Sequence, residues 1–208
     1  MRCLLFISCL LGVMACSSAY QKMQKLNGDA NCIESFSPSF SRALYSTKVN
    51  VVGKHLSGLL IIKTMPDSSI RMVFTNEAGF SFFDFGFRGD DFTVYHIVEQ
   101  MDRKAVVKTL RKDFELILMQ HIDEVSSNML KDGREYYHVF QRKGDYYYYI
   151  TDSACSKLIR MERWSRRKKV MEAIAVDYMM GIPDSIGIKH NNFDFTIELK
   201  RIYDHADQ

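Results

Sequence analysis

The side chains that could do chemistry in this sequence are scattered rather than clustered. The six histidines lie far apart, at positions 55, 96, 121, 138, 190 and 205, and no H-E-x-x-H pair or close His, Cys and Asp set has ligand spacing. The sequence also lacks a G-x-S-x-G elbow, a P-loop and a G-x-G-x-x-G turn. Two carboxylate pairs, Asp90 with Asp91 and Asp123 with Glu124, fall in predicted turns, where solvated charge explains them better. We therefore expect a protein that is not an enzyme and that holds neither a metal nor a cofactor.

The cysteines suggest a different use. Cys3 and Cys9 lie in an apolar N-terminal run, and Cys16 follows it directly. Cys32 and Cys155 are left as a pair, which in an oxidising compartment could form one disulfide. Two free thiols are the alternative, because the sequence gives no distance between them.

Residues 1–15 have the features of a signal peptide, with a positive charge at Arg2 and an apolar run too short to span a bilayer. Residues 13–16, Val-Met-Ala-Cys, resemble the lipobox of bacterial lipoproteins, which implies cleavage before Cys16 and diacylglycerol attachment to its sulfur. The alternative is an ordinary secretory signal followed by a chance cysteine. No acidic run follows Cys16, so we expect an anchor on the periplasmic side of the outer membrane. Residues 16–39 are polar and broken and are interpreted as a tether, with a turn of helix near 21–26.

The rest of the chain alternates between strand patterns and turn residues. Strands are predicted over these ranges: 44–55, 57–65, 69–76, 80–87, 91–98, 135–142, 146–152, 157–164, 170–180, 182–189 and 193–203. A helix is predicted over 103–121, with Asp102 as its N-cap and His121 as a capping cation at its C-terminus. The prediction is a mainly β (α+β) domain over 40–203, followed by a tail at 204–208. Its architecture is an antiparallel up-and-down incomplete β-barrel of about ten strands with one covering or plugging helix.

Two predicted strands carry more apolar surface than one buried face requires. Between residues 56 and 62 both faces are apolar, and between residues 80 and 87 phenylalanines occupy both faces. We therefore expect both faces of each strand to be buried against other apolar groups. A cavity between sheet and helix could hold acyl chains; a core filled by side chains is the alternative. The candidate lining residues, chosen by face, are Leu60, Ile62, Phe74, Phe82, Phe85, Leu110, Phe114 and Leu118.

Basic residues gather on the hairpin formed by 157–164 and 170–180. Such a cluster can meet anionic lipid head groups, although a solvated hairpin tip is the alternative. The formal net charge of +3, one unit of it from Arg2, is too small to indicate a nucleic-acid partner. The candidate head-group contacts are Arg163, Arg166, Arg167, Lys168 and Lys169, with Arg160 nearby.

The lipobox, a first set of about five strands, one helix and a further set ending in a Pro-led hairpin together resemble the LolA/LolB superfamily of periplasmic lipoprotein carriers and receptors. Three short sequence segments resemble those of LolB-like lipoproteins of Bacteroidetes-type bacteria: GLLIIK at 58–63, FTNEAG at 74–79 and IPDSIGI at 182–188. The resemblance covers about residues 40–203. LolB itself depends on an apolar side chain on a protruding loop, which we do not assign here.

What the resemblance implies is a lipid-anchored, monomeric envelope lipoprotein. It would bind a lipid or the acyl chains of a lipoprotein in an apolar cavity, for transfer or insertion at the outer membrane. The alternative is a structural or scaffolding lipoprotein that recruits an envelope protein through a sheet edge or the basic hairpin.

Overall fold

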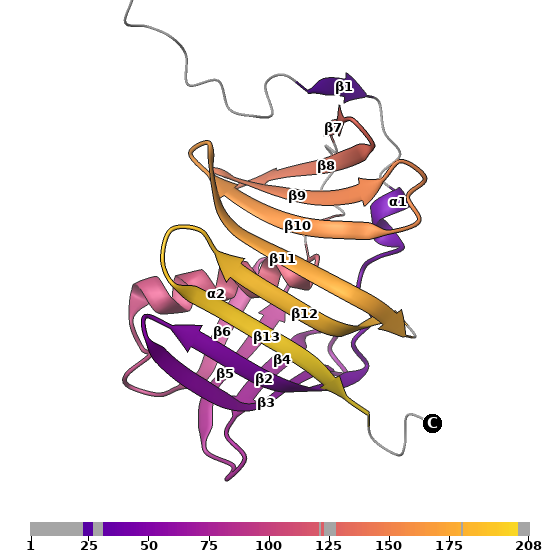
Figure 1. The fold of residues 1–208 in the computed structure, drawn as a ribbon. Helices are drawn as coiled ribbons and strands as arrows, with labels where there is room; N and C mark the ends of the chain where they lie inside the picture. Colours follow the sequence, from indigo (N-terminus) through magenta and orange to yellow (C-terminus); the bar gives the residue numbers. More distant parts are fainter. Residues whose placement is uncertain (1–22, 27–30, 121, 123–127, 180, 204–208) are drawn as a thin grey trace, which may run out of the picture.

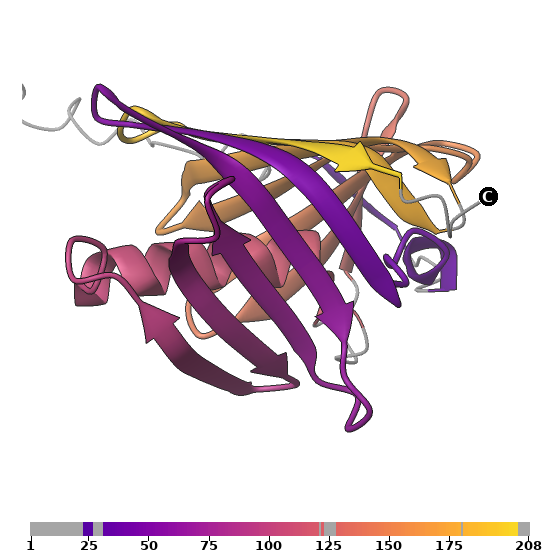
Figure 2. The same ribbon diagram turned by 90° about the horizontal axis from the view of Figure 1, so that it is seen from below.

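In the part of the chain that the structure describes, a single antiparallel sheet of 13 strands curves around one long helix (Figures 1 and 2). The computed structural model describes residues 23–26, 31–120, 122, 128–179 and 181–203. The predicted signal peptide, the predicted lipidation site Cys16 and the tail at 204–208 lie outside these residues. The elements in chain order are β1 (Gln24–Leu26), α1 (Asn31–Glu34), β2 (Arg42–Val51), β3 (Lys54–Thr64), β4 (Ile70–Thr75), β5 (Ser81–Arg88), β6 (Asp91–Ile97), α2 (Lys104–Ile117), β7 (Asn128–Asp132), β8 (Glu135–Arg142), β9 (Asp145–Asp152), β10 (Leu158–Ser165), β11 (Lys168–Met179), β12 (Ile182–His190) and β13 (Phe195–Ile202).

The strands follow one another across the sheet except at two places. β13 pairs with β2, and β1 pairs with β7, which gives the order β1-β7-β8-β9-β10-β11-β12-β13-β2-β3-β4-β5-β6. The sheet does not close on itself, and β1 and β6 are its edges. The prediction of a mainly β, antiparallel fold with one covering helix is confirmed, whereas the estimate of about ten strands was too low.

The strands form where apolar and polar residues alternate, because successive side chains of a strand point to opposite faces. In β3 and β4 the buried set is Leu60, Ile62, Met72 and Phe74, as the alternation predicts. Leu59 and Ile61 point to the opposite face and stay half-buried, so the expected cover of the second face is incomplete at these positions.

Helix α2 lies on the concave side of the sheet (Figure 2). Its apolar stripe recurs at helical spacing and is buried at Leu110, Phe114 and Ile117. The predicted N-cap was wrong by one residue: Arg103 is the N-cap, and no side chain caps the first turn. The predicted capping residue His121 lies outside the described residues.

Residues 31–39, which we expected to belong to a tether, instead pack against the sheet. Ile33 of α1 is fully buried in the core. Cys32 and Cys155 are joined by a disulfide, with their Cα atoms 6.0 Å apart, which ties α1 to the turn between β9 and β10. Residues 24–26, where a helical turn was expected, form strand β1 and pair with β7.

Candidate functional site

An apolar cavity of about 620 Å³ lies between α2 and the concave face of the sheet. Its wall comes from β2, β3, β4 and β5, from α2 between Ala105 and Phe114 and the residues before the helix, and from β13 with the turn that precedes it. The lining residues are Thr47, Val49, Val51, Lys54, Leu56, Leu60, Phe74, Phe80, Phe82, Phe83, Val98, Gln100, Met101, Ala105, Val106, Thr109, Leu110, Phe114, Phe193, Phe195 and Ile197.

A β-bulge in β5 supplies much of the aromatic wall. The pairing of β4 with β5 shifts register between Phe74 and Thr75: Phe74 pairs with Phe83, whereas Thr75 pairs with Ser81. Phe82 is therefore the extra residue of a bulge, which turns it toward the same side as Phe83. Its ring stacks on that of Phe74, with centroids 4.9 Å apart. The sequence pattern placed the phenylalanines of residues 80–87 on both faces of the strand. Because of the bulge, Phe82 and Phe83 both lie on the face that lines the cavity.

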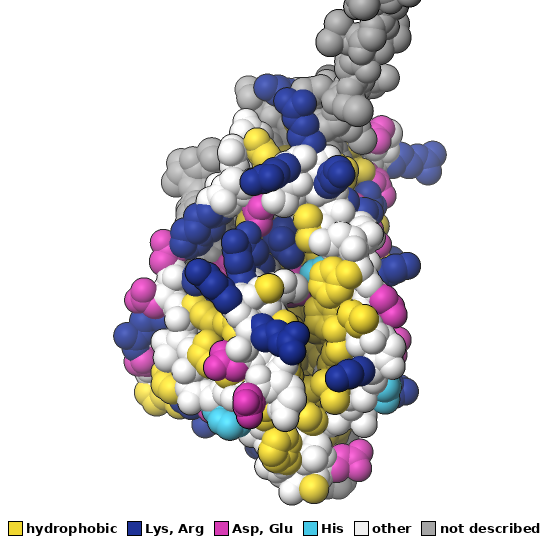
Figure 3. Space-filling model, turned by 90° about the vertical axis from the view of Figure 1, so that its left-hand side faces the viewer, with side chains coloured by type: hydrophobic (Ala, Val, Ile, Leu, Met, Phe, Trp, Pro, Cys, Tyr) yellow, Lys and Arg dark blue, Asp and Glu magenta, His cyan; other side chains and the backbone are white. Residues whose placement is uncertain are grey.

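The lining residues Val51, Lys54, Phe193 and Ala105 lie at or next to the β2–β3 turn, the β12–β13 turn and the start of α2. Figure 1 shows these three segments on the same side of the molecule. Figure 3 shows this side: hydrophobic side chains gather around a hollow, and Lys and Arg side chains gather above it. Two aromatic residues of the wall reach the surface, with 56% of Phe80 and 38% of Phe193 exposed. The opening therefore presents apolar rings to solvent.

The structure places five of the eight predicted lining residues on this wall: Leu60, Phe74, Phe82, Leu110 and Phe114. The other three, Ile62, Phe85 and Leu118, are buried in the core and do not line the cavity. Ile62 and Phe85 point to the correct face but are covered by their neighbours, and Leu118 follows the last residue of α2.

The contributions of β2, β13 and the start of α2 were missed. The clean alternation of Phe193, Phe195 and Ile197 was visible in the sequence. What was not visible is that β13 pairs with β2 and so faces the same cavity as β3 and β4.

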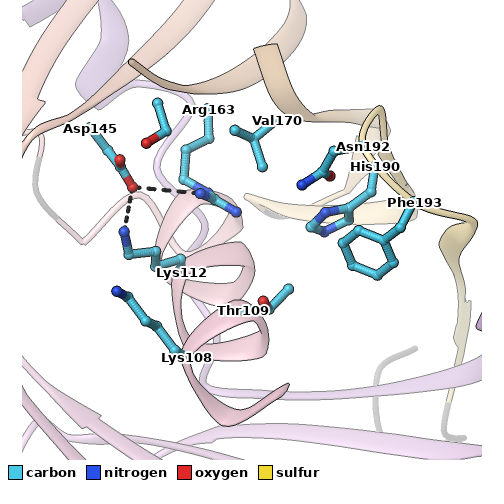
Figure 4. A pocket seen from close by; sticks show the side chains of 10 residues that line it. Lys108, Thr109, Lys112, Asp145, Arg163, Val170, His190, Asn192 and Phe193 are labelled. Atoms are coloured by element: carbon cyan, nitrogen blue, oxygen red, sulfur yellow. Dashed lines mark hydrogen bonds and ion pairs between the residues drawn. The ribbon is translucent and has the colours of Figure 1, made fainter. Parts of the chain in front are cut away.

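A second, polar pocket of about 260 Å³ lies beside the first, between the middle of α2 and the ends of β10 and β12 (Figure 4). Its wall consists of Lys108, Thr109, Lys112, Asp145, Arg163, Ser165, Val170, His190, Asn192 and Phe193. The sequence analysis did not find this pocket, because its charged residues come from segments far apart in the chain and form no motif.

Ion pairs organise the polar pocket. Lys112 donates to Asp145, and Arg163 lies 3.5 Å from the same carboxylate. Asp113, buried directly behind the wall, accepts from Arg163 Nη2 at 3.1 Å and from His190 Nε2 at 2.7 Å. This network joins α2 to β10 and to the β12–β13 turn.

The electrostatics of Asp145 reflect both burial and neighbouring cations. Burial alone would raise the pKa of its carboxyl, but hydrogen bonds from Lys112 and Ser165 and the charges of Lys112 and Arg163 outweigh burial and hold the pKa below its ordinary value. Asp145 is therefore ionised at neutral pH and neutralises part of the local positive charge.

Two polar atoms of this network lack a hydrogen-bond partner among the described residues: Nε of Arg163 and Nδ1 of His190. Both side chains are buried, with 6% of Arg163 and none of His190 exposed. A buried donor without a partner, such as Arg163 Nε, costs roughly 1–3 kcal/mol. The role of His190 Nδ1, donor or acceptor, depends on the tautomer of the ring.

The basic hairpin differs from its prediction. Arg163 was expected to contact lipid head groups from the tip, but its side chain points into the protein and pairs with Asp113. Lys169 pairs with Glu172 at 2.7 Å. The exposed tip is the turn formed by Arg166 and Arg167, both with positive φ, and by Lys168. Arg160 pairs with Glu135 and Glu162 on the sheet.

Within the described residues, no group of three or more His, Cys, Asp and Glu side chains is placed to hold a metal ion. Neither of the two helices described is long and apolar enough to cross a membrane.

No protein-family model matches the chain, and no curated protein matches it. Solved structures of low sequence identity are similar to the chain. A LolA superfamily protein of Nitrosomonas europaea is 7% identical, with a TM-score of 0.49 over 86% of this chain and 93% of that one. A DUF1329 family protein of Desulfovibrio piger is 10% identical, with a TM-score of 0.46 over 85% and 91%.

An outer membrane lipoprotein-sorting protein domain of Vibrio parahaemolyticus is 8% identical, with a TM-score of 0.46 over 84% of this chain and 88% of that one. At these identities and TM-scores the comparisons report similarity alone, and nothing about family, ligand or partner is taken from them.

Proposed function

We propose that this protein is a lipid-anchored envelope lipoprotein that binds a lipid, or the acyl chains of a lipoprotein, for transfer or insertion at the outer membrane. The observation that supports the proposal is the apolar cavity of about 620 Å³ beneath α2, which opens to solvent on one side. Ligand pockets in proteins typically have about 300–1,000 Å³, so the cavity is large enough for a chain-like ligand.

The composition of the wall selects the chemistry of the ligand. Most lining side chains are aliphatic or aromatic, and water inside such a cavity has few hydrogen-bond partners. Each methylene group moved from water into the cavity contributes about 0.8 kcal/mol. A chain of ten or more methylene groups would therefore outweigh much of the entropic cost of association, which is about 4–15 kcal/mol.

The anchor and the location are part of the same proposal. Acylation of Cys16 would hold the protein at the outer membrane on its periplasmic side, where chains taken up by the cavity can be released into the adjacent bilayer. No covalent chemistry is required, because apolar burial drives uptake and the open side permits release. We propose a monomer without a metal or an organic cofactor.

A blocked cavity tests the proposal. Ala105 lines the cavity near its opening and is exposed, so Ala105→Trp should fill the entrance while the fold is retained. Lys104→Trp, at the neighbouring exposed position outside the wall, is the matched control. In a displacement assay with a fluorescent fatty acid, we expect Ala105→Trp to weaken binding at least about tenfold, the equivalent of about 1.4 kcal/mol. Equal binding by the two variants, or no binding by the unmodified protein, would overturn the proposal.

A scaffolding function is the second candidate, and the free edge of the sheet favours it. β6 is an edge strand with exposed apolar side chains, 39% of Val94 and 57% of Tyr95, and such an edge can pair with another chain. The exposed tip at Arg166, Arg167 and Lys168 offers another contact. Native mass spectrometry of protein purified from membranes separates the two candidates. A co-purifying phospholipid or acylated peptide supports the carrier, whereas an empty cavity with a stoichiometric protein partner supports the scaffold.

A further inference from the structure

The polar pocket and the apolar cavity share a wall. Thr109 of α2 and Phe193 of the β12–β13 turn line both, so the two spaces are adjacent at these two side chains. An apolar compartment next to a charged one matches the chemistry of an amphiphile, which has a hydrocarbon chain at one end and a polar head group at the other.

The charge of the polar pocket is predominantly positive. Lys108, Lys112 and Arg163 contribute three cations to its wall against the one carboxylate of Asp145. Asp113 lies behind the wall and is engaged by Arg163 and His190. Figure 4 shows Lys108 and Lys112 on α2, with His190 and Asn192 across the pocket from them.

The ion pairs alone could be structural, since they join α2 to the sheet. They do not account for two further observations. Lys108 has no ion-pair partner among the described residues, although it lies one helical turn from Lys112, which pairs with Asp145. The space lined by Lys108, Lys112, Arg163 and His190 is open rather than filled by side chains.

We propose that the polar pocket binds the anionic head group, a phosphate or a carboxylate, of the amphiphile whose hydrocarbon chain occupies the apolar cavity. This inference rests on the proposed acyl-chain binding and adds the class of ligand: a single-chain or double-chain amphiphile with a negative charge next to the chain. Lys108 and Lys112 contribute charge at the open side of the pocket, and Arg163 contributes a buried, hydrogen-bonding guanidinium.

The test compares two ligands that differ only in the charged group. Full-length protein is titrated with palmitoyl glycerol and with palmitoyl glycerol phosphate, and inorganic phosphate is titrated alone. We expect the phosphate-bearing amphiphile to bind about tenfold more tightly than the neutral one, since one charge-assisted hydrogen bond accounts for a ratio of that size. Inorganic phosphate alone should bind far more weakly than the amphiphile, and added salt should reduce the preference.

Two lysine variants test whether the preference for the phosphate-bearing amphiphile arises in the polar pocket. Lys108→Ala should lower the ratio between the two amphiphiles about threefold to fivefold, which is the effect expected of one exposed cation beside an anion. Lys104→Ala, one turn earlier on the same helix and outside the pocket wall, should leave the ratio unchanged. Because both lysines are exposed, neither substitution threatens the fold.

The remaining outcomes show whether the head-group site alone or the proposed function itself is wrong. Equal affinity for the charged and the neutral amphiphile overturns the head-group site and leaves the acyl-chain cavity intact. An equal loss of both ligands in Lys108→Ala assigns Lys108 a structural role and also overturns the head-group site. Phosphate binding as tight as that of the amphiphile, and unaffected by Ala105→Trp, identifies a site for a free anion instead. Failure of both amphiphiles to bind overturns the proposed function itself.

Discussion

Asp113 shows at the scale of one residue how the charged network holds the fold together. Its carboxylate has no exposed surface and accepts hydrogen bonds from Arg163 and from His190. Asp113→Ala leaves the buried guanidinium of Arg163 without its partner, and breaking a buried pair in this way costs about 3–5 kcal/mol. We expect urea unfolding to show a loss of that size, with Asp91→Ala, an exposed aspartate of β6, as the control. A loss below about 1 kcal/mol would mean that the network contributes little to stability.

His138 links stability to pH. Burial lowers the pKa of its imidazole, because the charged form loses its hydration. In the unfolded chain the same group takes up a proton near its ordinary pKa of about 6.5, so the unfolded state binds more protons as the pH falls through this range. Stability should therefore decrease below about pH 6.5 and keep decreasing until the lowered pKa of the folded state is reached.

Unfolding experiments on His138→Gln measure this contribution. The free energy of unfolding of the variant should change less between about pH 7.5 and 5.5 than that of the unmodified protein. His55→Gln is the control, because His55 is exposed on β3. The same pH dependence in the His138 variant as in the unmodified protein would rule out this explanation.

At the scale of the elements, two glycines test how closely the strands approach. A Cβ atom added at Gly58 of β3 would lie 2.0 Å from the carbonyl oxygen of Thr75, which belongs to the backbone and cannot turn away. Gly58→Ala should therefore push β3 and β4 apart and cost about 1–3 kcal/mol. Gly187→Ala in β12 is the matched control, since a Cβ there meets nothing within 4 Å. The control should stabilise the strand by about 0.5–1 kcal/mol, because alanine loses less conformational freedom than glycine. Thermal unfolding should show a lower melting temperature for Gly58→Ala and a higher one for Gly187→Ala than for the unmodified protein.

The elements with a strong periodic pattern were predictable, and the short ones were not. Strands such as β4 and β13 alternate over six or more residues, and α2 carries an apolar stripe over four turns. β1 has three residues and β7 has five, too few for a period to stand out. They are held by pairing with each other and with β8, a tertiary interaction that the local sequence does not encode.

The lining residues of the candidate site also divide into those that a periodic pattern predicts and those that depend on tertiary pairing. Leu60, Phe74, Leu110 and Phe114 were found because face and periodicity place them under the helix. The bulge at Phe82 and the pairing of β13 with β2 decide the rest of the wall, and neither follows from the pattern of a single strand. The polar pocket escaped prediction for a further reason: Lys112, Asp145 and His190 are adjacent only in the folded chain.

For the molecule as a whole, the disulfide between Cys32 and Cys155 closes a loop of 123 residues. Linking residues so far apart restricts the unfolded chain, and removing such a link typically costs about 2–5 kcal/mol. We expect the double variant Cys32→Ser, Cys155→Ser to lose stability in this range and to unfold identically with and without a reducing agent. Unmodified protein that is equally stable in reducing and oxidising buffer would contradict this expectation.

The seam between β2 and β13 has a consequence for the order in which the sheet can form. β13 is the last strand that the structure describes, and its partner β2 comes early in the chain. Until β13 is in place, β2 and β12 both present unpaired backbone edges, and the core between them stays open. Long-range pairing of this kind makes folding slow. For a chain that crosses a membrane before it folds, as the proposed envelope location requires, these edges stay exposed until β13 arrives, and loss of β13 should cause aggregation rather than a smaller working domain.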